Sequence, residues 1–174
     1  PLTEDQVHNG IPHSTNFAYA HAKRMLDVQS RAYRKQYGCN FITAIPNNLF
    51  GENDNFDLEN SHVIPAIIRK IHEAKQIGSD VALWGNGRPK REFTYSMDLA
   101  EVLLFLLEHY DNPQFDGEIK WDRNKPSGQY RKPSDNSKLL ELGWHQENYS
   151  NLRESLKNVC EWFIINYPNI RGIG

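Results

Sequence analysis

Apolar residues recur at helical spacing in four long stretches of the chain, which predicts four amphipathic helices. The stretches are 16–37, 61–78, 96–110 and 151–167, and a shorter helix is expected over 136–142. In the stretch 96–110 the apolar residues cover most of the circumference, so we expect this helix to be among the most buried. Small polar residues that can cap helices stand at the start of the first and third stretches, namely Thr15 or Asn16, and Ser96.

Short apolar runs between these helices predict strands. Residues 39–45 follow the first helix directly and are largely apolar and β-branched, as in a buried strand of a parallel sheet. Further strands are expected over 80–84, 90–95 and 118–121. Open α/β sheets bind ligands at the carboxyl ends of their strands, which would place Asn47 and Asn48 at a binding edge. Both asparagines also suit an ordinary turn.

Composition restricts the classes of function. The chain has 174 residues and a formal net charge of -2, which gives no support to a nucleic-acid or membrane-surface partner. No apolar run approaches the length of a membrane span, and the first residues do not resemble a signal peptide. Two cysteines provide neither a disulfide framework nor a metal cluster, so we expect no metal and a cytoplasmic location.

Tyr19 and Lys23 stand four residues apart in the first predicted helix, so their side chains share one face. A nearby ammonium group favours the phenolate and lowers the pKa of a tyrosine. Such a pair can pass a proton to or from a substrate oxygen. The same spacing arises by chance on many amphipathic helices, so the pair alone does not identify an enzyme.

Three other residues allow two interpretations each. His62 lies at the start of the second helix, where it suits a cap or a solvated surface position. Arg91 projects from a predicted strand and is either a surface charge or a ligand for phosphate. Trp84 is either part of the core or an aromatic wall for a ring.

Several segments occur in an order that points to one enzyme family. Tyr19 to Lys23 forms a YxxxK motif, and it is followed by FITAIP, PNNLFGENDNF, NSHVIPAIIRKIHEA, VALWGNGRPKREFTYSMDLAEV and DNSKLLELGW. With these segments, nearly the whole chain resembles the carboxyl-terminal half of the GDP-L-fucose synthase family of extended short-chain dehydrogenase/reductases. YxxxK alone is shared widely, whereas SHVIPA and WGNGRPKREF in this order are specific.

The resemblance implies an enzyme that epimerises C3 and C5 of GDP-4-keto-6-deoxy-D-mannose and then reduces C4 with NADPH, yielding GDP-L-fucose. Tyr19 would donate a proton to the C4 oxygen, while Lys23 would lower the pKa of that tyrosine and hold the nicotinamide ribose. His62 would act as acid and base in epimerisation. With these three residues, the implied NADP(H) contacts are Pro46, Asn47, Asn48 and Leu49. The implied substrate-binding residues are Lys70, Trp84, Arg91 and Ser127, the last at a position where the family usually has an aspartate.

The resemblance also implies an α/β fold in two parts. Residues 1–60 would be the carboxyl-terminal part of a Rossmann domain with a doubly wound parallel sheet. Residues 61–174 would be mostly a small α/β substrate-binding domain, with an apparent internal deletion near 114–115. The family usually dimerises through helices that include the YxxxK helix, so a homodimer is implied.

Two alternatives remain open. The chain contains no glycine-rich turn for the pyrophosphate of a dinucleotide, which favours a non-catalytic fragment or partner-binding module. The presence of Tyr19, Lys23 and His62 argues against that alternative. Another nucleotide-sugar epimerase or dehydratase is the nearer rival, because it would share YxxxK.

Overall fold

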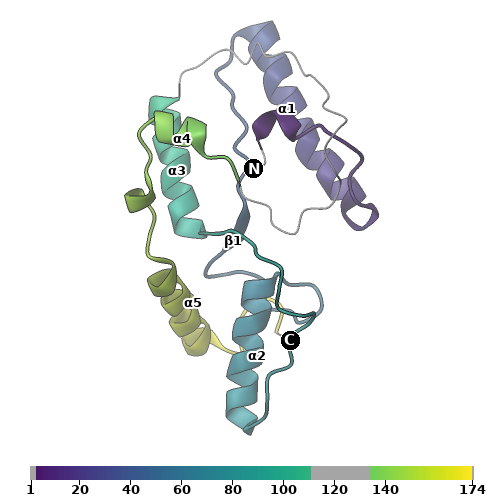
Figure 1. The fold of residues 1–174 in the computed structure, drawn as a ribbon, viewed down its shortest axis with the longest axis vertical. Helices are drawn as coiled ribbons and strands as arrows, with labels where there is room; N and C mark the ends of the chain where they lie inside the picture. The colour runs from purple at the N-terminus through teal and green to yellow at the C-terminus, as the bar shows by residue number, and fades with distance from the viewer. Residues whose placement is uncertain (1–2, 111–133, 174) are drawn as a thin grey trace.

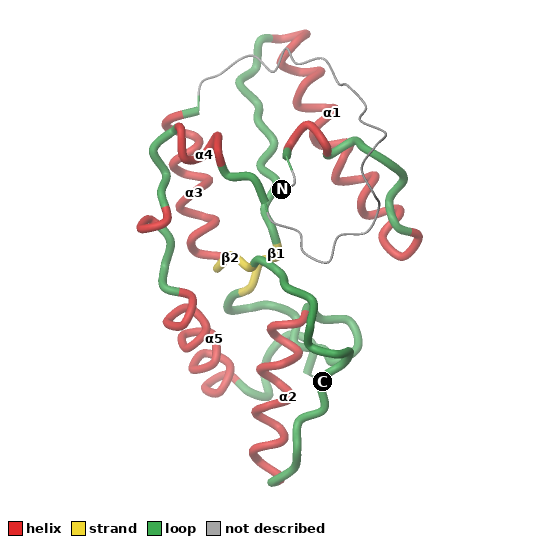
Figure 2. Tube along the Cα trace, viewed as in Figure 1, coloured by secondary structure: helices red, strands yellow, loops and turns green. Residues whose placement is uncertain are grey.

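A computed structural model describes residues 3–110 and 134–173 of the chain (Figure 1). Helices dominate this part, and the strands are short (Figure 2). The expected strand over 118–121, the junction at 114–115 and Ser127 lie outside the described residues. The helices are α1 (Phe17–Tyr37), α2 (Val63–Ile77), α3 (Ser96–His109), α4 (Ser137–Glu141) and α5 (Leu152–Asn166), and the strands are β1 (Asn48–Phe50) and β2 (Phe93–Tyr95).

The helix boundaries follow the sequence closely, with differences at the caps. Gly38 ends α1 with φ of 69°, a left-handed conformation that glycine adopts without steric cost. Asn151 caps α5 by accepting a hydrogen bond from the backbone N–H of Arg153. Ser96 is the first residue of α3 rather than its N-cap, so that predicted cap is wrong. Asn16 does precede α1, but its side chain accepts no capping hydrogen bond.

The strands form one parallel pair, in which Asn48, Leu49 and Phe50 of β1 face Phe93, Thr94 and Tyr95 of β2. Helix α2 lies between them in sequence, so β1, α2 and β2 make a β-α-β unit. This confirms a parallel sheet and places its second strand at the end of the predicted run 90–95.

Two predicted strands are wrong. Residues 39–45 and 80–84 adopt no strand, because no described segment pairs with either one. The first of these segments lies against α1 instead. Arg34 donates to the carbonyl of Phe41 at 3.0 Å, and the Tyr33 and Phe41 rings lie 5.8 Å apart. An apolar β-branched run satisfies its backbone by strand pairing only where a neighbouring strand is available.

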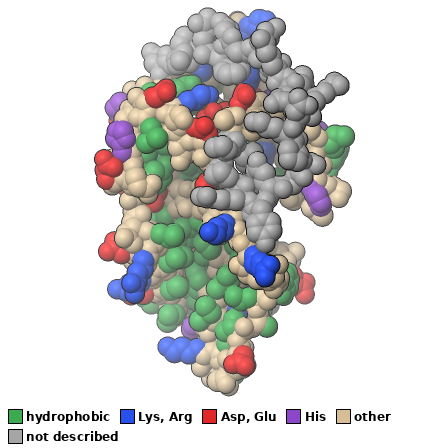
Figure 3. Space-filling view, viewed as in Figure 1, with side chains coloured by type: hydrophobic (Ala, Val, Ile, Leu, Met, Phe, Trp, Pro, Cys, Tyr) green, Lys and Arg blue, Asp and Glu red, His purple; other side chains and the backbone are tan. Residues whose placement is uncertain are grey.

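The core lies between β1, α2, α5 and the chain that follows α5. Five buried side chains form it, and Phe93, Tyr95 and Trp162 pack against them. Hydrophobic side chains also gather on the surface over α2 and α5 (Figure 3). The five core residues are Phe50, Phe56, Ile68, Val159 and Phe163.

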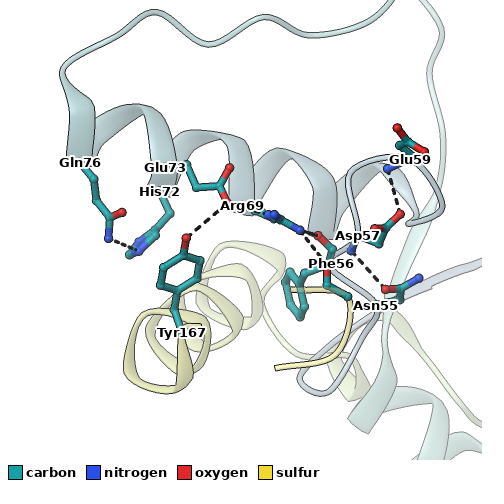
Figure 4. Close-up of polar contacts among 10 residues, drawn as sticks. Asn55, Phe56, Asp57, Glu59, Arg69, His72, Glu73, Gln76 and Tyr167 are labelled. Carbon is teal, nitrogen blue, oxygen red and sulfur yellow. Dashed lines mark hydrogen bonds and ion pairs between the residues drawn. The ribbon is translucent and has the colours of Figure 1, made fainter. Parts of the chain in front are cut away.

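Arg69 on α2 ties the carboxyl-terminal segment to this core (Figure 4). One of its terminal nitrogens donates to the carbonyls of Phe56 at 3.0 Å and Gly172 at 2.7 Å. Its Nε pairs with Glu73 on the next turn at 2.7 Å. Since the guanidinium is charged, each of these hydrogen bonds is stronger than a neutral one.

The prediction that α3 is among the most buried helices is wrong. Only Asp98 and Val102 are buried, whereas Leu104 and Leu107 are 62% and 77% exposed. One side of α3 faces the segment after α4, where the Phe105 and Trp144 rings lie 5.2 Å apart. The other side has no covering element among the described residues, so its leucines stay accessible.

Candidate active site

Tyr19 and Lys23 lie on successive turns near the start of α1, as their spacing predicts. The Lys23 Nζ atom lies 5.6 Å from the centre of the Tyr19 ring, which is cation–π distance. The tyrosine is 66% exposed. Its phenol is therefore accessible to a substrate and adjacent to a positive charge.

The segment predicted to line the nicotinamide begins at Pro46 and continues into β1, so Asn48 and Leu49 belong to a strand rather than a loop. The Asn47 side chain contacts β2, and the Asn48 side chain contacts the residue just before β2. The Thr94 hydroxyl donates to Asn47 Oδ1 at 2.7 Å, and Asn48 Nδ2 donates to the Glu92 carbonyl at 2.9 Å. These bonds fix the orientation of both amides at one end of the parallel pair.

Thr94 was not among the residues that the sequence suggested. Because the Asn47 oxygen accepts from Thr94, the two amide hydrogens of Asn47 are left to donate to another group. No described residue accepts a hydrogen bond from Asn47 Nδ2. The sequence signal that could have indicated Thr94 as a site residue is the alternation of side chains along the short strand 93–95.

His62 is the N-cap residue of α2, one residue before the helix begins. It is exposed, and its side chain makes no capping hydrogen bond, so the capping interpretation is wrong and the solvated one holds in this structure. Within the described part of the chain, no hydrogen bond or ring contact links His62 to Tyr19 or Lys23. The structure does not join the two sets of candidate acid–base groups by direct contact.

Lys70 and Trp84, both predicted to bind substrate, do meet. Lys70 Nζ lies 5.0 Å from the centre of the Trp84 ring and donates to the Ala82 carbonyl at 3.0 Å. The indole is 79% exposed, so Trp84 does not belong to the core. An open groove of about 280 Å³ adjoins this contact, and its walls are Lys70, Glu73, Ala74, Ile77, Ser79, Asp80, Val81 and Ala82.

Arg91 is exposed, and its described contact is a hydrogen bond to the neighbouring Lys90 carbonyl at 2.9 Å. It does not contact Lys70 or Trp84. Among residues 3–110 and 134–173, no three His, Cys, Asp or Glu side chains lie close enough together to hold a metal ion. The same residues contain no helix long and apolar enough to span a membrane.

Comparison with known proteins identifies the family to which the chain belongs. Residues 1–119 match the model of the NAD dependent epimerase/dehydratase family, so the chain belongs to that family.

Within it, the chain is a homologue of GDP-L-fucose synthases. The GDP-L-fucose synthase of Dictyostelium discoideum is 36% identical over 98% of this chain and 61% of its own length. The crystal structure of a GDP-L-fucose synthetase from Naegleria fowleri bound to NADP superposes with a TM-score of 0.84, at 35% identity, over 98% of this chain and 63% of that one. The chain therefore spans about three fifths of these relatives. The GDP-L-colitose synthase of Yersinia pseudotuberculosis is 35% identical over 94% of this chain and 61% of its own length.

Proposed function

We propose that this chain is the carboxyl-terminal part of a GDP-L-fucose synthase, with residues 1–60 completing a Rossmann domain and 61–174 forming most of the substrate-binding domain. The whole enzyme would epimerise C3 and C5 of GDP-4-keto-6-deoxy-D-mannose and reduce the C4 ketone. The observation that carries the proposal is the accessible Tyr19 phenol beside the Lys23 ammonium, in a chain homologous to these enzymes. The similarity to the NADP-bound structure supports the cofactor.

The residues present fit one end of NADP(H). The two amide hydrogens of Asn47 suit a carboxamide or hydroxyl acceptor, and the Lys23 ammonium suits ribose hydroxyls. We also assign Pro46, Asn48, Leu49 and His62 to contacts with the nicotinamide end of NADP(H). A bound NADPH supplies hydride. Its pyrophosphate requires a glycine-rich turn, which this sequence does not contain.

The protein's own contribution to reduction is a proton. As charge develops on the C4 oxygen, Tyr19 would donate its phenolic proton there, and the Lys23 charge would stabilise the resulting phenolate. In epimerisation, His62 would remove and return protons at the carbons next to the ketone. An imidazole is suited to this task because it titrates near neutral pH.

The sugar nucleotide would be held by charge and stacking. Lys70 and Trp84 already lie together beside a groove, and an exposed guanidinium such as Arg91 can bind a phosphate with two parallel hydrogen bonds. We retain Ser127 as a substrate contact on the basis of the resemblance alone.

A homodimer is also part of the proposal. α1 buries no residue, and one side of it is uncharged and exposed. Removing the apolar side chains of this side from water by pairing with a second copy would be favourable. That side consists of Ala18, Ala22, Met25, Leu26, Gln29, Ala32 and Tyr33.

The test uses the longest natural polypeptide that contains this chain, mixed with NADPH and GDP-4-keto-6-deoxy-D-mannose, with NADPH absorbance followed over time. Tyr19→Phe should lower the reduction rate by roughly 10²- to 10⁴-fold, because it removes the proton donor. Tyr37→Phe is the matched control, since Tyr37 lies on the same helix and is 63% exposed. A full reduction rate in Tyr19→Phe would refute the assignment.

Two alternatives have their own tests. A panel of GDP, UDP and dTDP keto sugars would reveal a different nucleotide-sugar enzyme, and the relative named as a GDP-L-colitose synthase makes a GDP-linked rival the first to include. If the chain is a non-catalytic binding module, it should not bind NADPH tightly. Tight NADPH binding by the chain would contradict the module.

A further inference from the structure

Glu92 lies between two residues to which the proposed function gives different ligands. It follows Arg91, the candidate phosphate ligand, directly in the chain. Its main-chain carbonyl accepts a hydrogen bond at 2.9 Å from Nδ2 of Asn48, a candidate NADP(H) contact. The structure therefore connects a candidate substrate residue to a candidate cofactor residue through Glu92.

The Glu92 side chain makes a second attachment, to a distant part of the chain. Its Oε2 atom accepts a hydrogen bond from the backbone N–H of Ser134 at 2.9 Å, and the two residues are 42 positions apart. Because the acceptor is a carboxylate, this bond is charge-assisted and stronger than a bond between neutral groups. The contact is partly buried, so water competes with it less than at a fully exposed site. Glu92 is thus held by both its main chain and its side chain.

The residue that follows Glu92 is also fixed. Phe93 begins β2, pairs with Asn48 across the parallel ladder and packs against the core. The Arg91 main chain therefore joins a well-anchored segment on its carboxyl side. The Arg91 guanidinium itself is exposed, and Nη1 donates to the Lys90 carbonyl at 2.9 Å.

A direct role for Glu92 in binding the sugar nucleotide conflicts with its charge. A carboxylate repels a diphosphate, and this repulsion is strong at short distance. In the structure, an oxygen of that carboxylate is instead engaged by the Ser134 N–H. The geometry therefore favours an anchoring role for Glu92 over ligand contact.

We propose that Glu92 is a positioning residue, whose bond to Ser134 holds the Arg91 main chain where the guanidinium can bind a phosphate of the sugar nucleotide. The inference rests on the proposed function, which makes Arg91 a phosphate ligand. Its effect is on affinity for the nucleotide. Binding of NADPH depends on it little, because Asn48 is held by the main-chain carbonyl of Glu92 and by its pairing with Phe93.

The test separates the reach of the Glu92 side chain from its charge, in the longest natural polypeptide that contains this chain. Glu92→Asp keeps the charge but is one methylene shorter, so its carboxylate falls short of Ser134. It should raise the dissociation constant for GDP, measured by calorimetry, roughly 3- to 10-fold, as is usual for residues coupled in one network. Glu92→Gln keeps the length and an acceptor oxygen, so its GDP affinity should stay within about twofold of the parent. Glu101→Asp is the matched control, because Glu101 is exposed on α3.

A double-mutant cycle with Arg91→Gln tests whether Glu92 acts through Arg91. In that background Glu92→Asp should weaken GDP binding no further, since the phosphate ligand is already lost. A loss of equal size in both backgrounds would overturn the positioning role. So would equal losses in Glu92→Asp and Glu92→Gln, or a matching loss of NADPH affinity, which would indicate a general loosening of the protein.

The parent polypeptide distinguishes the two levels of the argument. If it does not bind GDP, the proposed sugar-nucleotide site fails, and the role of Glu92 fails with it. If it binds GDP and Glu92→Asp binds GDP equally tightly, the role of Glu92 alone fails.

Discussion

The hydrogen bond between Tyr95 and Glu52 predicts a specific loss of stability at alkaline pH. The Tyr95 hydroxyl, at the end of β2, donates to both Glu52 oxygens, at 2.7 and 2.9 Å. Partial burial and the adjacent carboxylate raise the pKa of Tyr95 from 10.0 to about 12. The folded protein therefore keeps this proton at pH values where the unfolded chain has lost it.

The direction and size follow from proton linkage. Between pH 10 and about 12 the unfolded state binds fewer protons, so rising pH favours unfolding. The contribution of this group is complete below pH 10 and is lost as pH rises through about 12. Two pKa units correspond to about 2.7 kcal/mol. Because Tyr95 is only half-buried, solvent screening reduces the expected contribution to about 1–2 kcal/mol.

The assay is urea unfolding of the chain and of Tyr95→Phe at a series of pH values. Below pH 10 the variant should be less stable by about 1–2 kcal/mol, since it lacks a hydrogen bond to a charged acceptor. The difference should disappear by about pH 12. Tyr37→Phe serves as control because its side chain is 63% exposed. A constant difference across the whole series would refute the reasoning.

Three further changes have defined outcomes. Arg69→Met should lower the free energy of unfolding by about 3 kcal/mol in urea titration, because it removes charged hydrogen bonds to two carbonyls, those of Phe56 and Gly172. Gly172→Ala should destabilise by about 2 kcal/mol or more in the same assay, since Gly172 has φ of 85° and a Cβ would overlap the segment at Phe56. Thr94→Val should release the Asn47 amide and, on the proposed function, raise KM for NADPH a few-fold in steady-state kinetics, with kcat less affected.

The helices were predictable because their signals are local. Apolar spacing and terminal residues such as Gly38 and Asn151 act within one or two turns, and α1, α2 and α5 begin and end close to the predicted residues. Strands depend on a partner that is distant in sequence. The run 39–45 has the composition of a buried strand, but no described strand lies beside it, and its backbone turns to α1 instead.

Part of the candidate site was also predictable. The spacing of Tyr19 and Lys23 placed them together, as the structure confirms. The contact of Lys70 with Trp84 could not be predicted, because it depends on how the loop after α2 folds. The pairing of Thr94 with Asn47 could not be predicted either, because it depends on the register of β1 and β2. The bonds of Arg24 to the Asn9 and Gly10 carbonyls were not predictable, because a charge on an amphipathic helix gives no local sign that it binds a carbonyl far along the chain.

The candidate residues are held in place by two different kinds of contact, and this difference has a functional consequence. Asn47 is bonded to β2, and Lys70 lies on α2 beside the core, so these positions are fixed by burial of apolar side chains. Within the described part of the chain, Tyr19 and Lys23 lie on a helix that has no buried residue and is held mainly by polar contacts. Polar contacts at a surface contribute about 1 kcal/mol each, less than a buried aromatic side chain. On the proposed function, reduction should therefore depend on whatever covers the uncharged side of α1. Binding of the sugar nucleotide at Lys70 and Trp84 should not depend on it.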